Sequence, residues 1–467
     1  MPKTLLWLVA AIVLAMMIAA GLRAYGTALV GSGYSAEILC GAVFVSGREP
    51  AAVEAEDLSG PGLELAPYFD KQVERDAKRV AGSFHGLAAQ IAIFRDGFGC
   101  TRINRGTAAD LPAASAVPSI PPPDPAALWP EGERVDLATP PDGIDLPALN
   151  AAVASAFAEP DPAHPRNTRA LVVVHRGRIV AERYAPGFGT DTPLIAWSMA
   201  KGAANALIGL RVKDGKLAVT DKGLLPEWRG AGDRRAGISL DDLLRMSSGL
   251  AFDESYNDPL GDVTEMLFVA GDMAKFAAKK TLRHAPGSYW NYSSGTTVLL
   301  ARVLRETFAT EADYLRYPHE RLFGPLGMRS AVLETDASGT FVASSLLYAS
   351  ARDFARLGLL FLQDGVWRGE RLLPERWVAY TLAPTKAAPD ESYGAQMWLK
   401  LPESDGYGEP PLPADAFYFL GYDEQIIAVV PSRDLVIVRL GLTQQGGDWD
   451  HARDLAPIVV AVPRRGG

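Results

Sequence analysis

The chain has 467 residues, of which 48% are hydrophobic and 22% charged, so it can build a sizeable globular core. Its formal net charge of −9 argues against nucleic acid or an anionic membrane surface as a partner. The sequence also lacks a basic run with interleaved aromatic residues, which would indicate nucleic-acid binding.

An apolar segment opens the chain. Residues 4–22 read TLLWLVAAIVLAMMIAAGL and lie between Lys3 and Arg23. This length is typical of one membrane span and long for the core of a signal peptide. We therefore expect residues 1–25 to anchor the protein in the inner membrane of the cell envelope, with the rest in the periplasm of a Gram-negative cell. Cleavage near residues 24–28, which would release a secreted protein, stays open.

Two further segments precede the main domain. Residues 26–106 form a small accessory region that contains both cysteines, Cys40 and Cys100. In an oxidising compartment such a pair is expected to form a disulfide; the alternative is two unrelated buried thiols. Neither cysteine has histidine-rich surroundings, so we expect no metal site and no cofactor. Residues 107–140, rich in proline and alanine, predict an extended linker or a strap along a surface.

Residues 141–467 carry strong secondary-structure patterns. β-Hairpins are predicted at both ends of this region, over 169–184 and 425–441. Helices are predicted between and after them, over 198–212, 238–250, 353–362 and about 447–462. Gly215 is placed to stop the first helix, and Ser239 with Asp242 forms a capping pattern for the second, which should end at Gly249.

Hairpins that bracket a helical middle favour an α+β fold. The economical arrangement is one antiparallel sheet flanked by helices, with a helical lobe between its two halves. A cleft is expected where this lobe meets the sheet.

The stretch AWSMAKGAANALIGL (196–210) places Ser198 three residues before Lys201 at the start of an apolar helix. Residues three apart share a helix face, so the two side chains can touch. Lysine can take the serine proton only when it is neutral, and burial and the helix dipole both lower its pKa. By itself the pattern also fits a helix-capping serine followed by a lysine that reaches solvent.

Two other segments complete a reaction site. Tyr292, in PGSYWNYSSG (286–295), can carry a proton between nucleophile and leaving group, and a nearby lysine would favour its phenolate. Gly421, in FLGYDEQIIAVVP (419–431), allows backbone to approach a ligand closely. An N–H on that strand edge, paired with the N–H of Ser198, would form an oxyanion hole. The alternatives are a packed aromatic at a helix start and an ordinary turn.

These parts and their order resemble the serine β-lactamase and penicillin-binding protein superfamily. The similarity covers about residues 165–445 and is strongest to class C-like esterases and 6-aminohexanoate-dimer hydrolases. It is carried by SMAK, DDLLRMSSGL, PGSYWNYSSG, LFGPLGM, SSLLYASARDFARLG and GYDEQIIAVVPSRDLVIV.

The resemblance implies a role for each matching residue. Ser198 corresponds to the acylated nucleophile, Lys201 to its general-base partner and Tyr292 to the tyrosine of the second motif. The backbone N–H groups of Ser198 and Tyr422 correspond to the oxyanion hole. Tyr256, in the polar loop SGLAFDESYNDPLGD (248–262), corresponds by position to a substrate-contacting tyrosine; a surface aromatic is the alternative.

The sequence also departs from the family pattern. The second motif reads Tyr292-Ser293-Ser294, with no asparagine at the class C position. The third motif reads Leu420-Gly421-Tyr422 in place of K-T-G, and no basic residue stands at its first position. Because that basic residue normally helps to bind a substrate carboxylate, neutral or differently charged esters and amides are favoured.

The sequence thus predicts a hydrolase that forms an acyl-enzyme on Ser198 and releases the acid from a small ester or amide. The alternative is a catalytically inactive binding or sensor protein of the cell envelope. Retention of Ser198, Lys201 and Tyr292 together favours the enzyme.

Overall fold

The structure is a computed structural model that describes residues 3–103, 111, 117–402 and 412–465. Residues 104–110 and 112–116, at the start of the expected linker, lie outside the described residues. Farther along, the strap-like part contacts the main domain, where Arg356 Nε donates to the carbonyl oxygen of Pro130 at 3.1 Å.

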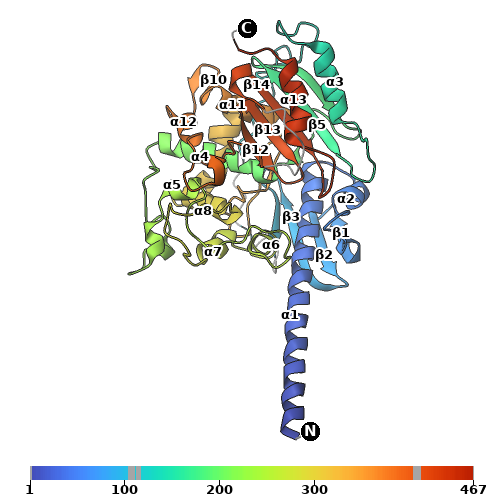
Figure 1. Ribbon diagram of the computed structural model, residues 1–467, viewed down its shortest axis with the longest axis vertical. Helices are drawn as coiled ribbons and strands as arrows, with labels where there is room; N and C mark the ends of the chain where they lie inside the picture. Colours follow the sequence, from blue (N-terminus) through green and yellow to red (C-terminus); the bar gives the residue numbers. More distant parts are fainter. Residues whose placement is uncertain (1–2, 104–110, 112–116, 403–411, 466–467) are drawn as a thin grey trace.

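A five-stranded antiparallel sheet forms the centre of the main domain (Figure 1). Both predicted hairpins are present and they meet at the β14–β5 pair, where Ile437 lies opposite Val173. The expected sheet built from the two ends of the domain is therefore confirmed. In spatial order its strands are β12 (Phe417–Gly421), β13 (Gln425–Val430), β14 (Leu435–Gly441), β5 (Thr168–His175) and β6 (Arg178–Tyr184).

Both faces of this sheet are covered by helices. Alternate residues of β14 point to opposite faces, so Val436 joins one hydrophobic core and Ile437 the other. Helix α11 (Ala351–Leu362) lies on the first face, and α3 (Leu146–Ala156) and α13 (His451–Ala461) lie together on the second (Figure 1). Sheet strands buried on both faces explain the continuous apolar runs in the sequence.

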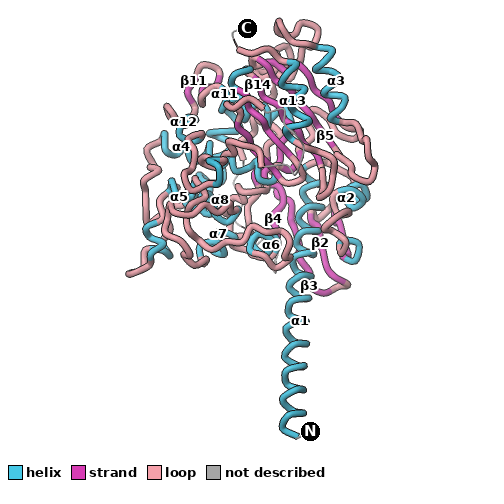
Figure 2. Tube along the Cα trace, in the orientation of Figure 1, coloured by secondary structure: helices cyan, strands magenta, loops and turns pink. Residues whose placement is uncertain are grey.

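A helical lobe lies beside the sheet, with many loops between short helices (Figure 2). Its helices are α4 (Ala200–Lys213), α5 (Leu240–Leu244), α6 (Asp262–Phe268), α7 (Met273–Ala278), α8 (Ser294–Arg305), α9 (Glu311–Pro318), α10 (Gly324–Leu326) and α12 (Trp377–Thr381). The short strands are β7 (Leu194–Ile195), β8 (Val332–Leu333), β9 (Leu347–Ala349), β10 (Val366–Trp367) and β11 (Glu370–Arg371).

Several predicted helix ends need correction. Helix α4 begins at Ala200 because a 3₁₀ turn over Trp197–Met199 precedes it, and it ends as predicted before Gly215, whose φ is +68°. The Ser239 capping box is present, but α5 ends at Leu244, before the left-handed backbone of Met246. The last helix begins at His451, where Asp450 caps it.

The accessory region packs a long helix on its own antiparallel sheet. The disulfide between Cys40 and Cys100 is present and joins the end of that helix to the sheet's last strand. The elements are α1 (Lys3–Cys40) with a π-helical end (Gly41–Val45), α2 (Pro50–Glu56), β1 (Phe69–Glu74), β2 (Arg79–Phe84), β3 (Leu87–Arg95) and β4 (Gly99–Ile103).

Helix α1 changes its surroundings halfway along. Its N-terminal part is exposed and projects away from the domain (Figure 1), and by length and composition it is long and apolar enough to be a membrane anchor or a signal sequence. From Gly26 onward the same helix contacts protein, and Val30 is buried. The expected boundary at residue 25 therefore falls inside one continuous helix, at the point where packing begins.

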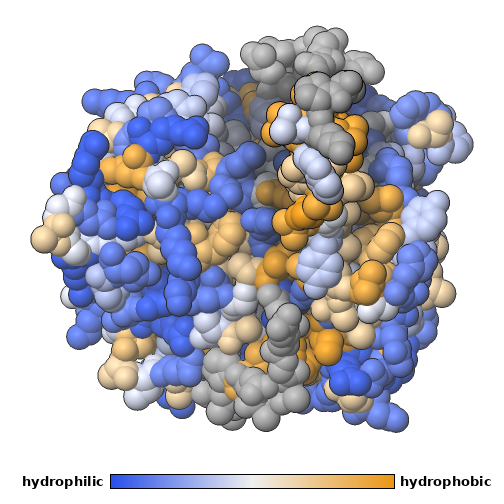
Figure 3. Space-filling model, turned by 90° about the horizontal axis from the view of Figure 1, so that it is seen from below, coloured by the Kyte–Doolittle hydropathy of each residue, from blue (hydrophilic) through white to orange (hydrophobic). Residues whose placement is uncertain are grey.

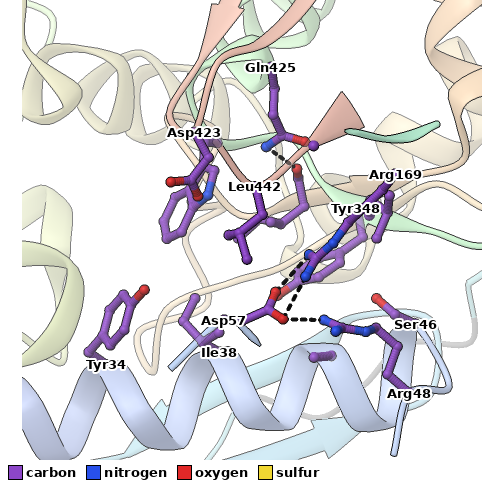
Figure 4. Close-up of a pocket in the computed structure, with 15 residues that line it drawn as sticks. Tyr34, Ile38, Ser46, Arg48, Asp57, Arg169, Tyr348, Asp423, Gln425 and Leu442 are labelled. Carbon is purple, nitrogen blue, oxygen red and sulfur yellow. Dashed lines mark hydrogen bonds and ion pairs between the residues drawn. The ribbon is translucent and has the colours of Figure 1, made fainter. Parts of the chain in front are cut away.

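Buried charges join the accessory region to the main domain. Asp57 lies between Arg48, at 2.5 Å, and Arg169 of β5, at 2.8 Å (Figure 4). Burial favours the neutral acid, but the two guanidinium groups hold the pKa of Asp57 below its usual value. A cavity of about 30 Å³ lies beside these charges, between α1 and Trp197.

Candidate active site

The segment before α4 presents Ser198 at the edge of the sheet. Trp197 has a φ of +46°, an unusual backbone conformation for a residue with a side chain, and Ser198 follows it half-buried. Gly421, at the end of β12, lies directly beside this segment. A Cβ atom at Gly421 would lie 2.4 Å from the carbonyl oxygen of Ala196, so glycine permits the contact.

Lys201 lies in the first turn of α4 and points to Ser198. Its Nζ atom donates to Ser198 Oγ at 2.8 Å, to Ser294 Oγ at 3.2 Å and to the carbonyl oxygen of Ser344 at 3.1 Å. Burial lowers the pKa of Lys201 to about 8, although the carboxylate of Glu254 acts in the opposite direction. The side chain is 2% exposed, so its ammonium form has lost nearly all contact with water.

Tyr292 lies on the other side of Lys201, just before α8. Lys201 Nζ lies over the ring of Tyr292, 4.8 Å from its centroid. Burial raises the pKa of Tyr292 above its usual value, while the side chains of Ser198 and Trp398 act in the opposite direction through hydrogen bonds. The expectation of a phenolate is therefore wrong, because the lysine faces the ring and burial favours the neutral phenol.

Glu254 is a site residue that the sequence analysis missed. It lies in the polar loop 248–262, two positions before Tyr256. Its carboxylate accepts hydrogen bonds from the Ser294 hydroxyl at 2.5 Å and from the Ser294 backbone amide at 2.7 Å. Burial raises the pKa of Glu254, whereas the nearby charge of Lys201 lowers it. A lone carboxylate in a loop carries no spacing signal, and only the fold brings it to α8.

Two tyrosines lie together beside the Ser198 segment. The rings of Tyr256 and Tyr422 are 5.4 Å apart between centroids, and Tyr422 also meets Trp197 edge-on at 5.9 Å. The turn from β12 to β13 thus lies next to the Ser198 segment, and loop 248–262 lies against that turn. Both tyrosines remain exposed at the surface.

The turn between β12 and β13 also contains Glu424. Asp423 and Glu424 have φ values of +61° and +56°, which gives the left-handed turn that joins β12 to β13. The Glu424 carboxylate lies 2.9 Å from Nε2 of His451, at the start of α13. This contact links the turn to the helix on the far side of the sheet.

A family model described as beta-lactamase matches residues 153–461, and the protein belongs to this family. It is 27% identical to the 6-aminohexanoate-dimer hydrolase of Paenarthrobacter ureafaciens over 300 residues, which cover 58% of this chain and 72% of that protein. The family and this relative establish a hydrolase of the serine-hydrolase group that acts on amides or esters.

Solved structures confirm the fold. A penicillin-binding protein homologue from Pyrococcus abyssi matches with a TM-score of 0.51 at 16% identity, over 68% of this chain and 77% of that one. A penicillin-binding protein from Bacillus halodurans matches with a TM-score of 0.50 at 16% identity, over 67% and 99% of the two chains.

Proposed function

We propose that the protein is an acyl-serine hydrolase in which Ser198 is the nucleophile and Lys201 its general base. The observation that carries this proposal is the 2.8 Å contact between Lys201 Nζ and Ser198 Oγ. The lowered pKa of Lys201 supports it, because a buried amine that is partly neutral near pH 8 can accept the serine proton.

The reaction has two halves. In the first, Ser198 Oγ attacks the carbonyl carbon as its proton passes to Lys201, and the oxyanion is held by the backbone N–H groups of Ser198 and Tyr422. The leaving alcohol or amine then takes a proton from Tyr292, which regains one from Lys201. In the second half, water attacks the acyl-serine ester, the same groups remove and return a proton, and the acid is released.

The surroundings favour Ser198 over Ser294, the other hydroxyl that Lys201 contacts. Ser294 is fully buried, and its hydroxyl is already directed at Glu254. Ser198 is half-buried and lies beside the exposed tyrosine pair. We therefore assign Ser294 and Glu254 to positioning Lys201.

The substrate we propose is an ester or amide without a carboxylate near the scissile bond. No basic side chain stands at the first position of the third motif, and Glu254 adds negative charge beside Lys201. Gly421 lets the backbone of β12 lie close to the Ser198 segment, where a bound acyl group would meet it, and Tyr256 approaches from the opposite loop through its contact with Tyr422. β-Lactams and peptidoglycan stem peptides fit this site less well.

We also propose that the enzyme works in the cell envelope, anchored through residues 4–22 with its main domain in the periplasm. The exposed apolar half of α1 supports the anchor. The Cys40–Cys100 disulfide supports an oxidising compartment.

A fluorophosphonate probe tests the enzymatic proposal. We expect one adduct, on Ser198, in the wild-type protein and in the control Ser288→Ala, whose serine is exposed and donates its hydroxyl to the carbonyl oxygen of Ala285. Ser198→Ala should give none. A folded wild-type protein that forms no adduct would instead be a binding or sensor protein.

A further inference from the structure

The proposed active site lies close to the point where the apolar helix leaves the domain. Arg23, the first charged residue after the apolar segment, pairs with Asp258 of loop 248–262 at 2.9 Å. The pair is exposed, so it contributes little stability, but it shows that this loop lies beside the end of the apolar segment. Leu260, two positions after Asp258, contacts Gly26 of α1, the helix that also carries Arg23.

Helix α1 also packs against α6, the helix that follows loop 248–262. Tyr34 packs edge-on against Phe268 of α6, with ring centroids 5.1 Å apart. A Cβ atom at Gly33 would lie 2.0 Å from the carbonyl oxygen of Phe268, so the two backbones are in direct contact. Helix α6, into which loop 248–262 runs, is therefore packed directly on α1.

The other part of this loop reaches the proposed reaction centre. Glu254 binds Ser294, which contacts Lys201, and the ring of Tyr256 packs at a tilt against that of Tyr422. Tyr256 and Asp258 are two positions apart in the sequence, so their Cα atoms are at most about 7 Å apart. Glu254 and Asp258 are four positions apart, which gives at most about 14 Å.

The residues near the end of the apolar segment of α1 are those expected at a membrane surface. Residues 4–22 of α1 rise about 28 Å, close to the thickness of a bilayer core, and Arg23 and Tyr25 follow at the interface. Tyr256 is 41% exposed and Tyr422 50% exposed. Seen from the side on which α1 leaves the domain, hydrophobic residues, including those of the projecting helix itself, form a central strip bordered by hydrophilic ones (Figure 3).

We propose that the bilayer presents the substrate: an amphiphile whose acyl chain stays in the membrane while its ester or amide group reaches Ser198 past Tyr256 and Tyr422. This inference rests on the proposed function. Asp253, Glu254 and Asp258 make the loop acidic, so the polar part of the amphiphile is neutral or cationic.

The distance between bilayer and domain tests this inference. The heptapeptide EAAAKEA, inserted between Tyr25 and Gly26, lengthens the helix by about 10 Å with little rotation. The control carries the same heptapeptide between Lys3 and Thr4, on the far side of the membrane. Each full-length protein is reconstituted in phosphatidylcholine vesicles and assayed with p-nitrophenyl palmitate held in the bilayer and with soluble p-nitrophenyl acetate.

We expect the wild type and the control to hydrolyse both esters. The spacer variant should lose at least ten-fold in palmitate turnover and keep its acetate turnover. Undiminished palmitate turnover by the spacer variant, or a wild type that hydrolyses acetate alone, would overturn the inference. A wild type that hydrolyses neither ester would instead contradict the proposed function itself.

Discussion

Lys201 and Glu254 lie on opposite sides of one hydroxyl group. Ser294 Oγ is 3.2 Å from Lys201 Nζ and 2.5 Å from Glu254 Oε1. The serine thus connects the buried amine to the buried carboxylate, and the charge of Glu254 acts on Lys201 without touching it. The protonation state of the proposed base is therefore set by burial and by one acidic residue.

Hydrolysis should depend on pH through Lys201. The pKa of Lys201 is about 8, so the amine is charged and inactive as a base below this pH and neutral above it. We expect kcat/KM for p-nitrophenyl acetate to rise with pH and reach half its maximum near pH 8. Lys201→Ala should lower kcat by about 10²–10⁴-fold and abolish this inflection. A flat profile in the wild type would count against Lys201 as the base.

Removal of the Glu254 charge should move this inflection. The carboxylate raises the pKa of Lys201, so Glu254→Gln should shift the half-maximal pH downward, by roughly one unit. The substitution is nearly isosteric, but the amide oxygen can accept only one of the two hydrogen bonds that Ser294 donates. Asp253→Asn, an exposed neighbour, is the matched control and should leave the profile in place. An unchanged profile in Glu254→Gln would show that the two groups do not interact.

Tyr292→Phe should discriminate between leaving groups. The raised pKa of Tyr292 keeps its hydroxyl protonated, as a proton donor must be. An amine needs that proton to depart, whereas p-nitrophenolate does not. We expect kcat for an anilide to fall at least ten-fold more than kcat for the matching p-nitrophenyl ester. Equal losses on the two substrates would leave Tyr292 a packing role.

Gly421→Ala should displace β12 from the nucleophile. The new Cβ atom would meet the carbonyl oxygen of Ala196 at 2.4 Å, and backbone cannot yield as a flexible side chain does. We expect kcat/KM to fall by about 10²-fold, since small misplacements are that costly, with a loss of about 1–3 kcal/mol in unfolding free energy. Gly230→Ala is the control, because an added Cβ atom there meets nothing within 4 Å. Wild-type activity in Gly421→Ala would show that the close contact between β12 and the Ser198 segment is not needed for catalysis.

The sequence predicted the parts of this protein whose signals are local. β-Rich apolar runs on either side of a turn identified both hairpins, and the three-residue spacing identified the Ser198–Lys201 contact. Short capping patterns placed Ser239 and Gly215 correctly.

Long-range features escaped because nothing local encodes them. Glu254 is one acid among many in the chain, and its role arises when loop 248–262 folds onto α8, forty residues later. The early end of α5 depends on the left-handed backbone of Met246, which its residue type does not favour. The phenolate expected for Tyr292 failed because sequence spacing does not show whether Lys201 faces the hydroxyl or the ring.

Mass spectrometry of the acyl-enzyme tests the central claim most directly. Wild-type protein is mixed with a p-nitrophenyl ester, quenched in acid during turnover and digested. We predict that the acyl group is found on the peptide that contains Ser198, that Ser198→Ala carries none, and that Lys201→Ala acquires it much more slowly. An acyl group on Ser294 or elsewhere, or full turnover by Ser198→Ala, would contradict the account.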